Sequence, residues 1–196
     1  EPVMEYTKPN VGKKYSIETV ADSDEFNTPS LGLQWQWQAN PQTGWAFPTS
    51  EGQLRMYSVY QSDSIINHWN LPNILGQKLP AEEFTARLKF YFKSLHVAEK
   101  FGFVMLGESY AYISIENRKD GFYIVCRENA TASENGIETE LASYPVAGNE
   151  FYFEIKVLKG GICHLSFAGK DEKFISIPGA YTMKPGRWVG AKLGMF

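Results

Sequence analysis

The sequence predicts an all-β protein in which two antiparallel sheets pack face to face as a β-sandwich. Three observations predict it. Apolar and polar residues alternate with a period of two from Phe26 onward, glycine-containing turn dipeptides separate the alternating runs, and no amphipathic helical stretch of normal length occurs. Alternation places apolar side chains on one face of a strand, and a sandwich buries two such faces against each other. We expect about ten to twelve strands.

The clearest strands lie in the middle and second half of the chain. In the segments 87–93, 110–115 and 150–157, every second residue is apolar. The residues that this pattern predicts to face the core are Leu88, Phe90, Phe92, Ala111, Ile113, Ile115, Phe151, Phe153, Ile155 and Val157.

Turn dipeptides predict how these strands pair. Asp120-Gly121 separates the second segment from the alternating run 122–127, and Gly160-Gly161 separates the third from the run 162–167. Such dipeptides supply the positive φ angles that tight hairpins need, so each pair is expected to be antiparallel. The only helical feature we expect is one short turn at 80–84.

Length and composition limit the class of protein. The chain has 196 residues, a size typical of one domain or of one domain with an appendage. With 19 basic and 22 acidic residues the net charge is −3, so we expect no nucleic-acid partner. No apolar run is long enough for a membrane span, and the first residues lack the order of a signal peptide.

The chain divides into an irregular segment and a domain. Residues 1–23 show no sustained periodicity and are interpreted as a linker or clasp, and residues 24–196 are expected to form the sandwich. Cys126 and Cys163 fit neither a zinc motif nor a redox motif. We expect two small buried hydrophobic residues, and the sequence leaves open whether they form a disulfide.

Most searches for catalytic motifs find nothing. The sequence contains no nucleophile elbow, zinc-protease motif, phosphate-binding loop or dinucleotide fingerprint. Its three histidines are far apart and are expected to be separate strand or loop residues. Glu138 and Glu140 lie two positions apart, roughly 6.6 Å along a strand, and could form the carboxylate pair of a glycosidase. The alternative is a solvated strand face.

A metal site has one candidate. Asp22 and Asp24, beside Glu25, could supply oxygen ligands to a structural calcium ion. The alternative is a turn at the start of the first strand. We expect no other metal and no cofactor.

The segment 31–41 is unusually rich in amides and aromatic rings. As a strand, it would place Leu31, Leu33, Trp35 and Trp37 on one face, and Gln34, Gln36 and Gln38 on the other. Carbohydrate recognition uses amides for sugar hydroxyls and aromatic rings for the C–H face of the sugar. The alternative is that Trp35 and Trp37 are core residues.

Four motifs resemble a known family. They are DEFNTPSLGLQWQW at 24–37, QKLP at 77–80, FGFV at 101–104 and PGRWVGAKLGMF at 185–196. Together they resemble the C-terminal domain of family 43 glycoside hydrolases, which include β-xylosidases and α-L-arabinofuranosidases. The resemblance extends from about Asp24 to the end of the chain.

This resemblance implies a concanavalin A-like jelly roll that follows a catalytic β-propeller, with residues 1–23 as the linker between them. The chain would then be an accessory domain that packs on the propeller and helps to close its substrate pocket. It would carry no catalytic residue. The implied substrate is a xylan- or arabinan-type plant cell-wall polysaccharide or oligosaccharide, and the implied location is the periplasm or outside the cell. Family members usually continue into one more strand, so we expect the last strand to be missing and an edge to be open there.

The residues that we predict to bind substrate are Gln34, Trp35, Gln36, Trp37, Trp45, Asn73, Gln77, Tyr110 and Tyr112. Two other functions remain as alternatives. One is a free-standing carbohydrate-binding module, and the other is a sandwich enzyme that uses Glu138 and Glu140.

Overall fold

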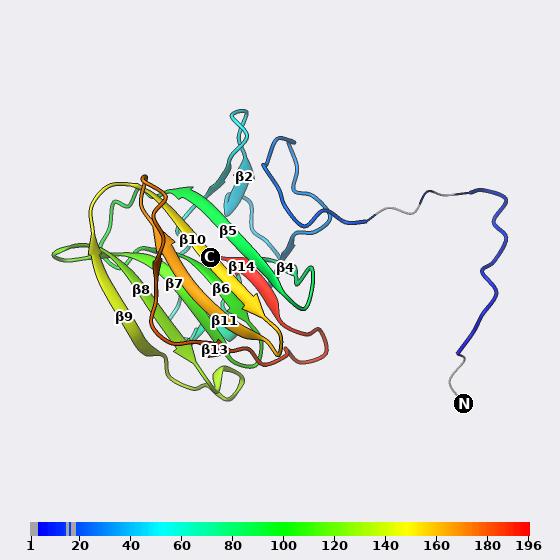
Figure 1. The fold of residues 1–196 in the computed structure, drawn as a ribbon. Helices are drawn as coiled ribbons and strands as arrows, with labels where there is room; N and C mark the ends of the chain where they lie inside the picture. The colour runs from blue at the N-terminus through cyan, green and yellow to red at the C-terminus, as the bar shows by residue number, and fades with distance from the viewer. Residues whose placement is uncertain (1–3, 15, 17–18) are drawn as a thin grey trace.

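The protein consists of two antiparallel sheets packed face to face, as predicted (Figure 1). The computed structural model describes residues 4–14, 16 and 19–196. The seven-stranded sheet contains, in spatial order, β1 (Gln36–Trp37), β4 (Leu75–Lys78), β14 (Lys192–Met195), β6 (Lys100–Leu106), β7 (Tyr110–Arg118), β8 (Gly121–Asn129) and β9 (Thr139–Val146).

The second sheet is smaller. It contains, in order, β12 (Ile175–Ser176), β11 (Ile162–Ala168), β10 (Glu150–Leu158) and β5 (Phe84–Tyr91), and β13 (Tyr181–Thr182) also pairs with β11. A separate hairpin joins β2 (Ala46–Pro48) to β3 (Leu54–Met56). In Figure 1 this hairpin stands beside the sandwich rather than within either layer.

Helical structure in the described part of the chain is limited to two short 3-10 helices, η1 (His68–Asn70) and η2 (Ala132–Glu134). The helical turn expected at 80–84 is not there, because the chain bends and β5 begins at Phe84. Of the predicted linker, residues 1–3, 15, 17 and 18 lie outside the described residues. Residues 4–14 contain no strand and run away from the sandwich in Figure 1.

The three predicted strands and both hairpins are confirmed. They correspond to β5, β7 and β10, and every pairing between neighbouring strands is antiparallel. Arg118 pairs with Gly121 around the Asp120-Gly121 turn, and Leu158 pairs with Ile162 around Gly160-Gly161. The first hairpin fixes the register between β7 and β8. This register determines which polar side chains of the two strands lie opposite each other.

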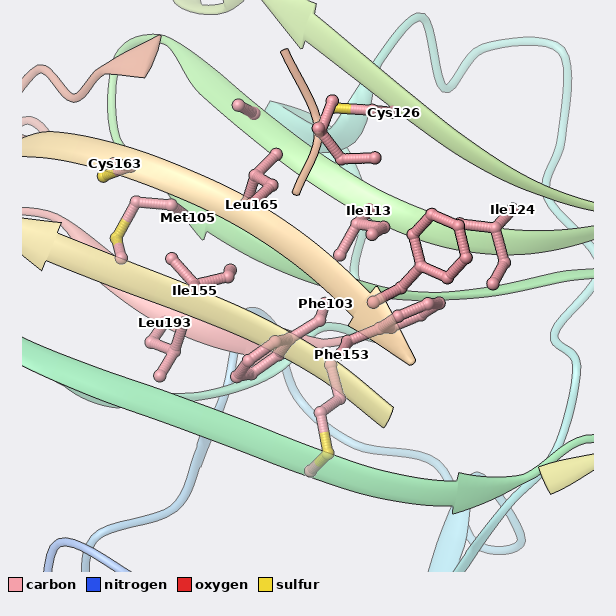
Figure 2. Packing of buried hydrophobic residues seen from close by; sticks show 14 of the residues in the cluster. Phe103, Met105, Ile113, Ile124, Cys126, Phe153, Ile155, Cys163, Leu165 and Leu193 are labelled. Atoms are coloured by element: carbon pink, nitrogen blue, oxygen red, sulfur yellow. The ribbon is translucent and has the colours of Figure 1, made fainter. Parts of the chain in front are cut away.

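The core lies between the two sheets, and Figure 2 shows its centre. Phe103, Ile113 and Ile124 come from the larger sheet, and Phe153 and Ile155 come from the smaller one. All ten residues predicted to face the core belong to this cluster or pack against it. Cys126 and Cys163 are buried here as free thiols, which answers the question of a disulfide.

Two expectations about strands are wrong. The segment 31–38 is a strand only at Gln36–Trp37, because a turn intervenes in which Trp35 N donates to Gly32 O (3.1 Å). Leu33 lies in this turn and is 96% exposed. There is also no open edge at β14, because β14 pairs with β4 on one side and β6 on the other.

A second apolar cluster covers part of the outer face of the seven-stranded sheet. The segment around η1 lies over β6 and β7 and buries their outward side chains. Its buried members are Leu71, Ile74, Val104, Leu106, Tyr110, Tyr112, Ala132 and Phe196. At one end, the outer face of this sheet is therefore covered by the segment around η1.

Candidate functional site

Three side chains meet around the carboxylate of a fourth on the outer face of the seven-stranded sheet. Glu138, just before β9, accepts hydrogen bonds from the hydroxyls of Tyr110 (2.6 Å) and Tyr112 (2.9 Å). Its Oε1 also lies 2.8 Å from Nδ1 of His68. We call these four residues the Glu138 cluster. Tyr110 and Tyr112 are fully buried, so their rings support the cluster and offer no face to a ligand.

A cap on η1 fixes the position of His68. The Oδ1 of Asn67 accepts a hydrogen bond from Trp69 N (3.0 Å), and its Nδ2 donates to Ala132 O (3.1 Å). The imidazole packs against Tyr112 (4.5 Å between ring centroids) and Phe196 (4.3 Å). This packing leaves His68 only 4% exposed, and its Nε2 has no hydrogen-bond partner in the described structure.

Arginines and carboxylates form a second group beside the first. Arg127 contacts both carboxylate oxygens of Glu116 and donates to the Tyr112 hydroxyl (3.2 Å) and to Glu140 (2.8 Å). Arg118 donates to Glu140 (2.9 Å) and Glu116 (3.3 Å). We call Glu116, Arg118, Arg127 and Glu140 the Arg127 cluster.

Strand register explains this meeting. The β7–β8 hairpin pairs Tyr112 with Arg127, so both side chains lie on the same face of the sheet. A β-bulge between β8 and β9 shifts the pairing so that Glu140 stands opposite Arg127. Bulges redirect side chains in this way.

The carboxylates of Glu138 and Glu116 are held in the ionised form. Burial alone raises the pKa of Glu138, but hydrogen bonds from His68 and Tyr110 and the charge of Lys100 outweigh it and lower the pKa to about 2. Burial also raises the pKa of Glu116, and the contacts with Arg127 reverse this and lower it below its ordinary value.

The partners of Glu138 are neutral donors. Burial lowers the pKa of His68 below 6.5, against the opposing effect of its hydrogen bond with Glu138. At neutral pH the ring is uncharged and donates from Nδ1. Burial raises the pKa values of Tyr110 and Tyr112, so both phenols keep their protons.

These electrostatics do not favour acid–base catalysis. Hydrolysis of a glycosidic bond needs one carboxyl group that stays protonated near neutral pH. The pKa values of Glu138 and Glu116 are shifted in the opposite direction, and an oxygen of Glu140 accepts from two arginines. The clusters can bind and orient polar groups, but they hold no proton ready for donation.

Several other predicted site residues lie next to the segment that precedes the sandwich, which we call the incoming chain and which includes Asp22 and Asp24. The carboxylate of Asp24 accepts from Phe26 N (2.7 Å), Gln34 Nε2 (3.2 Å) and Trp35 Nε1 (2.8 Å). Gln77 Nε2 donates to the backbone oxygen of Asp22 (3.1 Å). Asp22, Asp24, Trp35 and Gln77 line a cleft of about 300 Å³ between β4 and β5.

Asp24 therefore joins the segment before the sandwich to the turn that carries Gln34 and Trp35. Its oxygens are engaged by three N–H groups of the protein. Within the described residues, no three His, Cys, Asp or Glu side chains are grouped closely enough to hold a metal ion.

The remaining predicted site residues lie near β1. Trp37 packs edge-on against the buried Trp45 (5.4 Å between centroids), and Gln36 is exposed on the edge strand β1. The buried side chain of Asn73 accepts a hydrogen bond from Gln61 (2.9 Å). The structure thus distributes the nine predicted residues among three places rather than one.

Sequence reasoning did not include His68, Glu116 or Arg127 among the site residues. A signal for Arg127 was present, because a tight turn at Asp120-Gly121 implies that Tyr112 pairs with Arg127. Glu116 shares a strand face with Tyr112. No local pattern indicates His68, which is 42 residues before Tyr110 in the chain.

Comparison with known proteins agrees with the fold. Residues 23–196 match the family described as the β-xylosidase C-terminal concanavalin A-like domain. The chain belongs to this family. The domain is therefore one of those found in family 43 glycoside hydrolases, as its motifs suggested.

A curated relative is a β-xylosidase of Formosa agariphila, 26% identical over 220 residues. The match covers 100% of this chain and 35% of that protein, so the chain spans about a third of the length of the relative.

Solved structures of family 43 proteins share the fold. A GH43 glycoside hydrolase engineered for endo-xylanase and exo-arabinofuranosidase activity matches with a TM-score of 0.79 and 18% identity, over 97% of this chain and 40% of that one. The Bacillus licheniformis GH43 protein BlXynB matches with a TM-score of 0.73 and 16% identity, over 88% of this chain and 34% of that one.

No helix in the described residues is long and apolar enough to cross a membrane.

Proposed function

We propose that this domain is the non-catalytic accessory part of a family 43 glycoside hydrolase that acts on xylan- or arabinan-type glycans. In this proposal it packs against a catalytic β-propeller and helps to close the substrate pocket. The observation that carries the proposal is the family match over residues 23–196, combined with coverage of only 35% of the related β-xylosidase.

The state of the carboxylates supports a non-catalytic role. Glu138 is the best-placed carboxylate of the outer face, and its pKa of about 2 makes it unsuitable as a general acid. The names of the relatives support the substrate class, because one is a β-xylosidase and another carries endo-xylanase and exo-arabinofuranosidase activities.

An exposed tryptophan supports docking on a catalytic domain. Trp188 is 96% exposed and has a φ of 72°, a left-handed conformation that costs a bulky residue energy. The neighbouring Val189 is also exposed. A strained loop that displays an indole is typical of an interaction anchor, since tryptophan is enriched among residues that dominate binding energy.

The place of this loop fits the same partner. The loop ends at Lys192, which pairs with Lys78 at the end of β4. The side chain of Gln77, the residue before Lys78, holds the backbone of Asp22. The Trp188 loop and the incoming chain therefore lie at the same end of the seven-stranded sheet, where a preceding domain would be nearest.

A free-standing binding module is less well supported. Such a module needs exposed rings, but three of the aromatic residues predicted to bind substrate, Trp45, Tyr110 and Tyr112, are buried. We therefore do not propose this alternative.

The first test is to read the coding sequence upstream of Glu1. We expect an in-frame catalytic β-propeller, and an unrelated sequence there would contradict the proposal.

The second test uses the protein that contains both the catalytic domain and this domain. In it, Trp188→Ala is expected to lower kcat/KM on an aryl β-xyloside or α-L-arabinofuranoside by about tenfold or more, as for an interface anchor. Ile175→Ala, which alters an exposed residue of β12, is the matched control. Equal activity of the two variants would show that Trp188 does not serve as the anchor.

A further inference from the structure

A polar hollow of about 460 Å³ lies over the Glu138 and Arg127 clusters, and neither the fold nor the docking role accounts for it. It is lined by the cations Lys100, Arg118, Lys119 and Arg127 and by the carboxylates Glu116 and Glu138. Its volume is within the range of small-molecule sites. Four cations around two carboxylates are notable in a chain whose net charge is −3.

The arginines and Glu116 already satisfy one another. Arg127 and Arg118 both contact Glu116, and both donate to Glu140. Arg118 also donates to Ser143 (3.3 Å). These contacts hold the floor of the hollow in one arrangement before any ligand arrives, which lowers the entropic cost of binding.

Two lysines of the hollow remain uncommitted. Lys100 has its ammonium group 5.7 Å from the centre of the Tyr112 ring. Across the residues that the structure describes, neither Lys100 nor Lys119 forms an ion pair or a side-chain hydrogen bond. Each ammonium has three N–H groups, so the hollow has an excess of positively charged donors.

One acceptor complements these donors. Oε1 of Glu138 accepts from both Tyr110 and His68, whereas Oε2 accepts only from Tyr112. Oε2 can therefore take one more hydrogen bond from a hydroxyl group. An anion such as sulfate has no hydroxyl to donate, but a sugar acid has both a carboxylate and hydroxyls.

We propose that this hollow binds a uronic acid residue of a glycan, with its carboxylate at Lys100 and Lys119 and a ring hydroxyl at Oε2 of Glu138. The site would let the accessory domain hold an acid-substituted glycan chain. The glycan part of this inference rests on the proposed function, while the anionic group rests on the lining of the hollow.

The test is a calorimetric titration of the chain with four probes. They are a xylo-oligosaccharide that carries one glucuronic acid substituent, the unsubstituted oligosaccharide of equal length, free glucuronate and inorganic sulfate. We expect the substituted oligosaccharide to bind at least about tenfold more tightly than the unsubstituted one, with affinity that falls as salt rises. We expect sulfate to bind more weakly than glucuronate.

Lysine variants test whether the ligand binds in the hollow. Lys100 and Lys119 form no ion pair or side-chain hydrogen bond in the described structure, and the one contact of the Lys100 ammonium is with the Tyr112 ring. The double variant Lys100→Ala and Lys119→Ala should therefore stay folded, with an unfolding temperature within a few degrees of that of the parent chain. Its Kd for the substituted oligosaccharide should rise by about tenfold or more, the effect of lost charge-assisted hydrogen bonds. Lys156→Ala, on the opposite sheet, is the matched control.

Three results would overturn the inference. They are equal binding of the substituted and unsubstituted oligosaccharides, sulfate binding as tight as that of glucuronate, and a Kd unchanged in the double lysine variant. Absence of binding at millimolar concentrations would also overturn it. None of these bears on the proposed accessory role, which is tested by the upstream sequence and by Trp188→Ala.

Discussion

Oε1 of Glu138 lies 2.8 Å from Nδ1 of His68, a residue 70 positions earlier in the chain. The same carboxylate accepts from Tyr110 and Tyr112 on β7. One ionised group therefore joins the segment that covers the outer face, the sheet beneath it and the start of β9.

Glu138→Gln should destabilise the fold. The amide has nearly the same shape, but it lacks the charge, and its NH₂ group cannot accept the hydrogen bonds that the carboxylate accepts. We expect the free energy of unfolding at pH 7 to fall by about 1–3 kcal/mol, the usual cost of leaving buried polar partners unsatisfied. Urea denaturation measures it. Glu134→Gln, at an exposed residue of η2, should change stability little. Equal losses in the two variants would contradict the role of Glu138.

The free energy of unfolding should also decrease in two steps as the pH is lowered. Because the pKa of folded His68 is below 6.5, the unfolded chain takes up a proton that the folded chain excludes, and stability falls as pH drops through about 6.5. Because the pKa of folded Glu138 is about 2, a second loss occurs as pH drops from about 4.5 toward 2.

Denaturation across this pH range separates the two groups. His68→Phe should flatten the first step, and Glu138→Gln should flatten the second. His164→Gln, at an exposed position of β11, is the control for the first step. An unchanged first step in His68→Phe would show that this histidine is not responsible.

Neither cysteine should react while the protein is folded. Burial raises the pKa of Cys126 to about 12 and that of Cys163 to about 11, so almost no thiolate forms at pH 8. A thiol reagent should label no cysteine in the native protein and both after denaturation. Rapid labelling of either thiol under native conditions would contradict the burial of that residue.

Gly107 should not tolerate a side chain. A Cβ atom at this position would collide with the backbone oxygen of Lys184, which lies at the base of the Trp188 loop. Gly107→Ala should therefore cost roughly 1–3 kcal/mol in the free energy of unfolding, as overpacking usually does. At Gly169, the nearest atom to an added Cβ is 3.9 Å away. Gly169→Ala should be close to neutral, and an equal cost at both positions would show that the loop does not pack on Gly107.

The sandwich could be predicted because its strands show their period directly in the sequence. Phe151 to Val157 alternate without interruption, and all four apolar residues of this run are buried. The structure of the segment 31–38 was harder to predict from the sequence. Its apolar residues also alternate, but Gly32 allows a turn there, and the carboxylate of Asp24 holds Gln34 and Trp35 in that turn. A contact ten residues away cannot be seen in a local pattern.

The candidate site was only partly predictable for the same reason. Sequence reasoning correctly placed Tyr110 and Tyr112 on the face away from the core, but it could not show that the η1 segment covers them. That cover is formed by residues such as His68 and Phe196, which are distant in the chain and meet only in the fold. The two tyrosines that were predicted to bind substrate are therefore buried residues that support Glu138.

The activity of the purified chain on aryl β-xylosides and aryl α-L-arabinofuranosides tests the central claim most directly. The account predicts that no aryl group is released above the uncatalysed rate, even though the chain is folded, because Glu138 and Glu116 are held ionised and an oxygen of Glu140 accepts from two arginines. Sustained release that disappears in Glu138→Gln or in Glu140→Gln would contradict it, since the domain would then be an enzyme in its own right.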